Sequence, residues 1–167
     1  MDLLVNLDVP DLARAEALYT HAFGLSVGRR FGTAATELTG LPARLYLLHK
    51  PAGSIGAGNA PRDYSRHWCP VHLDVVVADL DTALARAERA GFAREGEVRG
   101  ESFGRIIQLA DPFGHGWCLL EFSDRGYDAI AIATAAGQTG PWTGPGAGPV
   151  PRASRSRHRP SQNAGRG

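Results

Sequence analysis

Histidine and cysteine have the widest chemical range of the residues in this chain, because imidazole exchanges protons near neutral pH and both side chains bind transition metals. The sequence holds six histidines and two cysteines. The cysteines, Cys69 and Cys118, are too few for a disulfide framework, so reduced thiols are expected. The sequence contains no serine nucleophile elbow, Walker loop or dinucleotide fingerprint. Any chemistry must therefore come from single side chains that the fold brings together.

An internal repeat indicates the elements that would position such side chains. Residues 7–12 (Leu-Asp-Val-Pro-Asp-Leu) recur as residues 75–80 (Val-Val-Val-Ala-Asp-Leu), with Asp11 and Asp79 in register at an offset of 68 residues. Each copy ends an apolar stretch typical of a strand and begins a helical pattern. A repeat of this length is too long for a solenoid unit and fits a small half-domain. Two such halves could bury their sheets only by pairing.

Each half is predicted to contain a strand, a helix and three further strands, which together make an α+β fold. In the first half the strands are expected at residues 3–9, 27–31, 33–39 and 44–49, and the helix at 12–23. In the second half the strands are expected at 71–77, 93–99, 104–109 and 116–122, and the helix at 81–90. The resulting domain, residues 1–127, consists of module 1 (3–50), a linker (51–68) and module 2 (69–123).

The composition separates this domain from a basic tail. The chain has 167 residues, of which 43% are hydrophobic, and a net charge of +1, so it has no overall attraction to nucleic acid or to membranes. From Asp128 onward five arginines stand against one acidic residue, among many glycines and prolines. Such a segment lacks the apolar content to join a core, so residues 128–167 are expected to form a disordered Gly/Pro/Arg-rich tail. Aromatic residues do not alternate with its arginines, which argues against a nucleic-acid arm.

Two sequence motifs, together with the repeated order βαβββ, carry a resemblance to a known family. The first helix opens with Val9-Pro10-Asp11-Leu12, and Asp111-Pro112-Phe113-Gly114-His115 precedes the last strand. With these features residues 3–123 resemble the vicinal oxygen chelate superfamily, which includes glyoxalase I, bleomycin-resistance proteins and extradiol dioxygenases. The resemblance implies two βαβββ modules in tandem that form a cupped mixed sheet, with the helices on its outer face. It does not imply one reaction, because members range from lyases to drug-sequestering proteins.

The resemblance also implies where a metal would bind. In metal-dependent members a histidine lies seven residues before the aspartate of each Asp-Leu pair, and a glutamate lies on the fourth strand of each half. The matching residues here are Leu4 and His72 for the histidines, and Tyr46 and Cys118 for the glutamates. Leucine offers no donor and neutral tyrosine is a poor one, so the inherited metal site is expected to be lost.

His72 and Cys118 are the remaining metal candidates. With a third donor from His49 or His67 they would form a zinc site. The alternative is that His72 is a hydrogen-bonded histidine of the cavity and that Cys118 packs as a small apolar side chain.

Strand alternation predicts which other side chains share the cup with these residues. The ligand-binding residues predicted in this way are Asn6, Asp8, Leu48, Cys118 and Phe122, and Trp68 is added from the segment before module 2, where it could cover the ligand. Asp8 and Asp74 could instead be solvated at the rim, and Trp68, at the module junction, could instead fill a core edge. In an enzyme, His72 would act as acid or base, with Tyr46 and Asp74 assisting.

These residues favour a protein that binds a small, partly apolar molecule without a conventional metal, as drug-sequestering members of the superfamily do. The alternative is a lyase, isomerase or dioxygenase, either metal-free or with an atypical metal site. No cofactor is expected, and a divalent metal is the alternative. The expected partners are a small-molecule ligand or substrate and a second copy of the chain in a homodimer. Neither a membrane nor nucleic acid is expected. Because no basic region precedes a long apolar run at the start, a cytoplasmic location is predicted.

Overall fold

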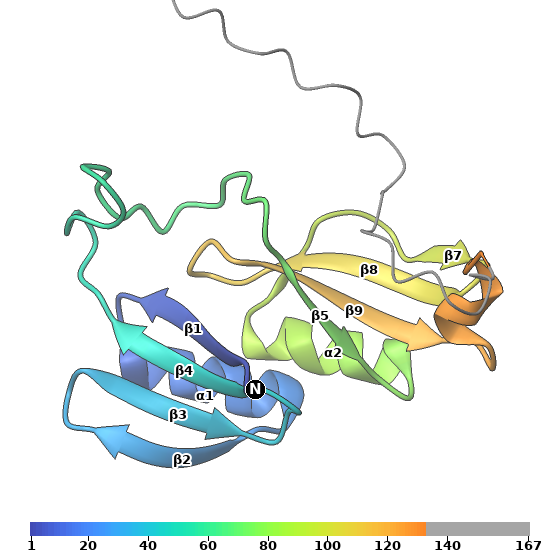
Figure 1. The fold of residues 1–167 in the computed structure, drawn as a ribbon, viewed down its shortest axis with the longest axis horizontal. Helices are drawn as coiled ribbons and strands as arrows, with labels where there is room; N and C mark the ends of the chain where they lie inside the picture. The colour runs from blue at the N-terminus through green and yellow to red at the C-terminus, as the bar shows by residue number, and fades with distance from the viewer. Residues whose placement is uncertain (133–167) are drawn as a thin grey trace, which may run out of the picture. The chain divides into compact units, whose positions relative to one another are not determined.

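A computed structural model describes residues 1–132, of which residues 1–131 form one compact unit with two sheets (Figure 1). The predicted tail falls outside the described residues from position 133 onward. Within the described residues no helix has both the length and the apolar character needed to cross a bilayer.

Module 1 forms a four-stranded mixed sheet in the order β1-β4-β3-β2. Its elements are β1 (Leu4–Val9), α1 (Leu12–Phe23), β2 (Ser26–Phe31), β3 (Ala35–Thr39) and β4 (Arg44–His49). β1 pairs with β4 in parallel, and the remaining pairs are antiparallel. The predicted order of strand, helix and three strands is therefore confirmed for this half.

Module 2 repeats the arrangement, with the strand order β5-β9-β8-β6 and with β7 also paired to β8. Its elements are β5 (Leu73–Val76), α2 (Leu80–Ala90), β6 (Ala93–Arg94), β7 (Arg99–Glu101), β8 (Gly104–Ala110) and β9 (Gly116–Phe122). The prediction of a single strand at 93–99 is wrong, because the structure has two short strands there. β6 ends at Arg94, and the chain pairs with β8 again from Arg99. Gly96 lies between the two strands with a φ of 133°, a conformation that interrupts a continuous strand.

The two Asp-Leu pairs of the repeat are the starts of the two helices. Asp11 is the N-cap of α1 and accepts a hydrogen bond from the Arg14 amide at 3.0 Å. Asp79 is the N-cap of α2 and accepts one from the Thr82 amide at 3.1 Å. A side-chain oxygen at this position satisfies an amide that lacks a partner within the helix, which is why aspartate stands there in both halves. α2 therefore begins at Leu80, one residue earlier than predicted.

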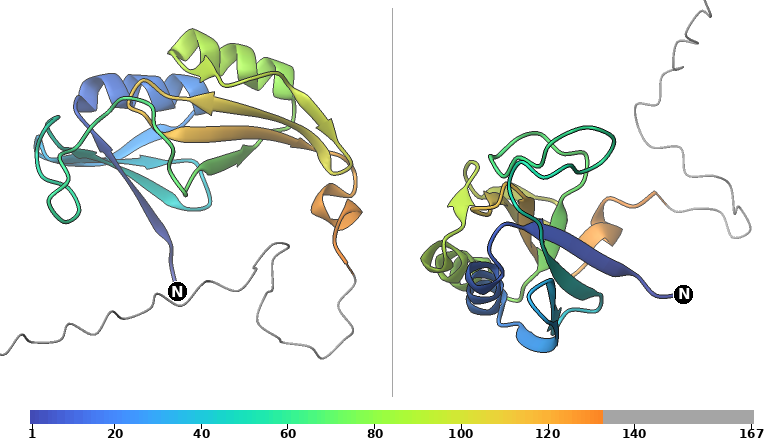
Figure 2. Two further views of the ribbon diagram at one scale, coloured as in Figure 1. Left: turned by 90° about the horizontal axis from the view of Figure 1, so that it is seen from above. Right: turned by 90° about the vertical axis from the view of Figure 1, so that its left-hand side faces the viewer.

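The core lies between the helices and one face of each sheet (Figure 2). Leu7, Val9, Leu45 and Leu47 of module 1 and Leu119 of module 2 are buried on that face. Alternate residues of the same strands face the other way, as the period of two in a strand requires. The open face of each sheet is therefore free to carry polar side chains.

Aromatic rings join α1 to module 2. Tyr19 and Phe23 of α1 lie 5.5 and 5.1 Å from the ring of Trp117 on β9, measured between ring centroids. Phe23 also packs on Phe92, which follows α2, at 5.2 Å. The two helices also contact each other. One apolar core thus spans both halves of the repeat.

A buried carboxylate lies within this aromatic cluster. Asp111, in the turn between β8 and β9, accepts hydrogen bonds from the Tyr19 hydroxyl at 2.6 Å, Trp117 Nε1 at 2.9 Å and His115 Nδ1 at 2.9 Å. Its second oxygen accepts from the amides of Phe113 and His115. Burial raises the pKa of Asp111, but the hydrogen bonds and charge of His115, with the bonds from Tyr19 and Trp117, outweigh that effect, so the pKa lies below its usual value.

The connector between the modules, residues 51–72, is fastened at several points. Arg62 pairs with Asp8 of β1 at 2.7 Å, and Arg66 pairs with Glu95 at 2.6 Å. At Gly114 the connector backbone comes so close that an added Cβ would lie 2.9 Å from the Ser65 carbonyl oxygen. Gly114 also has a φ of 87°, so glycine is required there for two reasons.

The chain beyond β9 turns back toward the sheet of module 2. A short helix, η1 (Gly126–Ala129), follows β9, and the Tyr127 ring packs on Phe122 and Phe103 with centroid distances of 4.8 and 5.2 Å. Ordered structure therefore continues past residue 127, where the composition had placed the domain boundary.

We predict that Asp111→Asn lowers the free energy of unfolding by about 2 to 4 kcal/mol, because an amide NH₂ would face two or three buried donors. Tyr19→Phe, which removes one donor and leaves the carboxylate otherwise satisfied, should cost about 1 kcal/mol. Urea unfolding of the three proteins at pH 7 measures both values. An Asp111→Asn variant as stable as the parent would contradict this role.

The lowered pKa of Asp111 also predicts a pH dependence. A carboxyl whose pKa is lower in the folded state stabilises the fold above its unfolded pKa of about 3.9, and that stability is lost as the pH falls through the folded pKa. The parent should therefore lose stability below about pH 4 more steeply than Asp111→Asn does. The free energy of unfolding is measured by urea titration at several pH values from pH 6 to pH 2. If it falls equally with pH in the two proteins, the prediction is wrong.

Candidate functional site

The open face of module 2 holds a histidine, an aspartate and a cysteine close together. Asp74 of β5 stands opposite Cys118 of β9 in the parallel pair, and His72 precedes β5. His72 Nε2 lies 3.2 Å from Asp74 Oδ1, and one donor atom of each of the three residues lies within 4.8 Å of the others. Cys118 is buried, whereas His72 and Asp74 are exposed.

The surroundings keep the Cys118 thiol protonated. Burial raises the pKa of the thiol to about 12. The negative charge of Asp74, and the hydrogen bond between the thiol and the Asp74 carboxylate, raise it further. Burial and the nearness of Asp74 and Cys118 also raise the pKa of Tyr127 on η1. The predicted site residue Phe122 lies beneath the Tyr127 ring, so this end of the module 2 face is partly covered.

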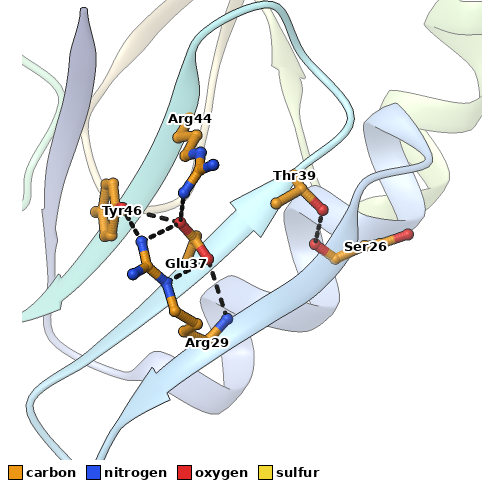
Figure 3. Close-up of polar contacts among 6 residues, drawn as sticks. All are labelled: Ser26, Arg29, Glu37, Thr39, Arg44 and Tyr46. Carbon is orange, nitrogen blue, oxygen red and sulfur yellow. Dashed lines mark hydrogen bonds and ion pairs between the residues drawn. The ribbon is translucent and has the colours of Figure 1, made fainter. Parts of the chain in front are cut away.

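The open face of module 1 carries a different group of residues, which we call the Glu37 cluster: Arg29, Glu37, Arg44 and Tyr46 (Figure 3). Tyr46 stands opposite Glu37 in the β3–β4 pair and donates its hydroxyl hydrogen to Glu37 Oε1 at 2.8 Å. Arg29 of β2 binds both carboxylate oxygens, through Nε at 3.0 Å and Nη2 at 2.8 Å. Arg44 Nη1 reaches Oε1 at 3.1 Å. Arg29 Nη2 also donates to the Tyr46 hydroxyl at 2.9 Å.

Glu37 is the buried centre of this cluster. Only 4% of its side chain is exposed, and the hydrogen bonds from Arg29 and Tyr46 hold the pKa of Glu37 well below its usual range. The same contacts raise the pKa of Arg29. Gly28 makes room for the carboxylate, since an added Cβ there would lie 2.7 Å from Glu37 Oε2. The cluster is therefore permanently charged at neutral pH.

A hollow of about 800 Å³ adjoins the Glu37 cluster, and we call it the module 1 hollow. It is lined by Met1, Asp2, Leu3, Leu4, Arg29, Pro42, Ala43, Arg44 and Tyr46. Its wall is mainly apolar at Leu3, Leu4 and the β3–β4 loop, acidic at Asp2 and cationic at the cluster. A smaller cavity of about 250 Å³ lies where the connector meets module 2, with His72 and His115 among apolar lining residues.

The predicted site residues are divided between these places. Tyr46 lines the module 1 hollow, whereas His72 lines the smaller cavity. Asp8 is held by Arg62 of the connector, Asn6 is exposed, and Leu48 is half-buried. Trp68 is 82% exposed on the connector.

The family's four-ligand metal site does not fit these residues. Leu4 has no donor atom, and the Tyr46 hydroxyl already contacts Glu37 and Arg29. The chain offers instead a set of three donors, His72, Asp74 and Cys118. Catalytic zinc sites typically have this number of protein ligands. Asp74 completes this set, where the sequence had suggested His49 or His67.

The sequence interpretation missed Glu37, Arg29 and Arg44 as functional candidates. One signal was available: Glu37 is the only charged residue of a strand that otherwise reads Ala-Thr-Leu-Thr, and arginines stand on the neighbouring strands. An acid in that setting has to meet a cation if its side chain is buried.

The fold, together with a family match over residues 4–120, places the chain in the vicinal oxygen chelate superfamily. More narrowly, residues 4–120 match the Glyoxalase-like domain, and the chain belongs to that family. Uncharacterized proteins of Mycobacterium bovis and Mycobacterium tuberculosis are 30% identical to it over 125 residues, covering 68% of this chain and 78% and 70% of theirs.

Solved structures show the same fold. The fosfomycin resistance protein FosX of Listeria monocytogenes has a TM-score of 0.56 at 15% identity, covering 74% of this chain and 93% of its own. A glyoxalase/bleomycin resistance protein/dioxygenase of Alicyclobacillus acidocaldarius has a TM-score of 0.55 at 17% identity, covering 74% and 92%. TioX of Micromonospora sp. has a TM-score of 0.55 at 20% identity, covering 74% and 99%. At these identities the likeness extends to the fold alone.

We predict less than one equivalent of zinc, nickel, iron or manganese per chain in protein purified without added metal, and no change in melting temperature with a chelator. The reason is that two of the four inherited ligand positions are lost and that His72 and Asp74 are exposed. Elemental analysis by mass spectrometry measures the content, with His72→Ala as the control. One equivalent of metal that His72→Ala abolishes would refute the prediction.

Proposed function

We propose that this chain binds a small, partly apolar molecule in the module 1 hollow and that binding needs no metal. The observation that carries the proposal is the hollow itself: about 800 Å³, with leucine, proline and alanine on one side and polar groups fixed on the other. The volume lies within the range of about 300 to 1,000 Å³ that is typical of small-molecule sites in proteins, and the wall offers polar groups to orient a ligand beside an apolar part of about equal extent. The proposal agrees with the resistance proteins among the structural relatives.

Pre-ordering of the polar groups supports binding rather than a solvated surface. Tyr46 and Arg29 are held by Glu37 before any ligand arrives, so a ligand would not have to order them. Strand pairing also fixes their backbones.

The second candidate is an enzyme of the same superfamily, a lyase, isomerase or dioxygenase. The observation that favours it is the three-donor set on module 2, which would hold a divalent metal in an atypical site. Without metal, the His72–Asp74 pair would supply an acid or base. Tyr46 would assist such chemistry only after release from Glu37, because its hydroxyl is already bonded there.

We expect a neutral apolar fluorophore such as N-phenyl-1-naphthylamine to bind the chain at one site, and Ala43→Trp to weaken binding at least tenfold by filling the hollow. The matched control is Ala57→Trp, which places the same ring on an exposed part of the connector. Fluorescence titration measures both, with melting curves to check folding. Equal affinity for the two variants, or no binding by the parent, would exclude the module 1 hollow as the site.

A further inference from the structure

We infer that the ligand of the module 1 hollow is an anion, a carboxylate or phosphonate on an apolar body, whose acidic group binds Arg29 and Arg44. This inference rests on the proposed function and adds the chemical class of the ligand. Three observations support it: the net positive charge of the Glu37 cluster, the N–H groups of its arginines that have no protein acceptor, and the difference between this cluster and the neighbouring Arg30–Glu16 ion pair.

The charge balance of the cluster is positive. Two guanidinium groups meet at a single carboxylate oxygen, because Glu37 Oε1 accepts from Arg29 Nη2 at 2.8 Å and from Arg44 Nη1 at 3.1 Å. Glu37 neutralises one of the two cations and leaves one positive charge at the wall of the hollow. Asp2 also lines the hollow and offsets this charge over the hollow as a whole, so the attraction for an anion is local to the two guanidinium groups. A second anion placed between the arginines would relieve the repulsion between them.

The unused donors face no protein acceptor. A guanidinium carries five N–H groups. Among the residues described, Arg29 Nη1 and Arg44 Nε and Nη2 donate to no other side chain or carbonyl. More than half of each arginine side chain is exposed, and both line the hollow. Carboxylates and phosphonates match a guanidinium edge with two parallel hydrogen bonds, which neutral ligands do not.

The neighbouring residue on β2 shows what a simple structural ion pair looks like here. Arg30 faces away from the cluster and pairs with Glu16 of α1 at 2.8 Å, one cation to one anion. Arg29 alone would satisfy Glu37 in the same way, through its two bonds to the carboxylate. Arg44 is surplus to that pairing, and an exposed surplus ion pair adds little to stability. A ligand-binding role accounts for the second arginine.

Benzoate and benzamide are the probes for the test, because they share a ring and differ in charge. The full chain should bind benzoate at least tenfold more tightly than benzamide, by calorimetry or by displacement of the neutral fluorophore, and phenylphosphonate should also bind. Arg29→Gln and Arg44→Gln should each weaken benzoate binding about tenfold and benzamide binding by no more than about threefold, because the neutral amide can accept a hydrogen bond but has no charge to pair with the guanidinium. Arg30→Gln is the matched control, since it removes the same charge from the next residue.

The outcomes separate this inference from the proposed function. Equal affinity for benzoate and benzamide, with the neutral fluorophore still bound, would overturn the anion and keep the hollow as a site. An equal loss with Arg30→Gln would show a general charge effect and would also overturn it. If neither probe nor fluorophore binds, both proposals fail. Should Arg29→Gln unfold, Arg44→Gln and Arg29→Lys, which keeps the charge but loses the paired donors, decide the question.

Discussion

The buried carboxylate of Asp111 constrains the aromatic core in which the two modules meet. It lies in the β8–β9 turn of module 2, yet one of its partners is Tyr19 on the helix of module 1. A buried carboxylate is tolerated only when its oxygens are fully hydrogen-bonded, and here side chains from both halves meet that demand. Displacement of one module from the other would break the bond from Tyr19 and leave the carboxylate with only the donors of its own module.

The two halves of the repeat agree where packing constrains them and differ where it does not. Both use aspartate as the helix N-cap, and both bury the same face of the sheet beneath a helix. The open faces have separate chemistry: arginines around a glutamate in module 1, and a histidine, an aspartate and a cysteine in module 2. Core positions tolerate few substitutions, whereas an open face can change its residues without loss of the fold.

Much of the fold could be predicted because local signals and the repeat pointed to the same elements. The Asp-Leu pairs placed both helices, and strand alternation identified the residues of β1 and β4 that pack under the helices. It did not predict burial on β9, where Cys118 and Leu120 of the open face are also buried. The division of the 93–99 strand could not be predicted, because it depends on the conformation of Gly96, and glycine is compatible with both a strand and a turn.

The candidate site was harder to predict, because its contacts run between strands. Tyr46 could be assigned to the open face, but its contact with Glu37 depends on the β3–β4 register. Likewise, Asp74 meets Cys118 through the register of β5 and β9. Alternation along one strand indicates the face on which a residue lies, and only the pairing of strands indicates its neighbours.

The fastened connector has a consequence for how copies of this chain can assemble. Arg62 and Arg66 fix it to both modules, and Gly114 lets its backbone lie against the β8–β9 turn. The connector therefore holds the two modules of one chain close together. Each module consequently has a high effective concentration relative to the other module of the same chain. Exchange of modules between two chains would have to break these contacts before it gained any. A homodimer of this protein would accordingly join two intact units through their surfaces.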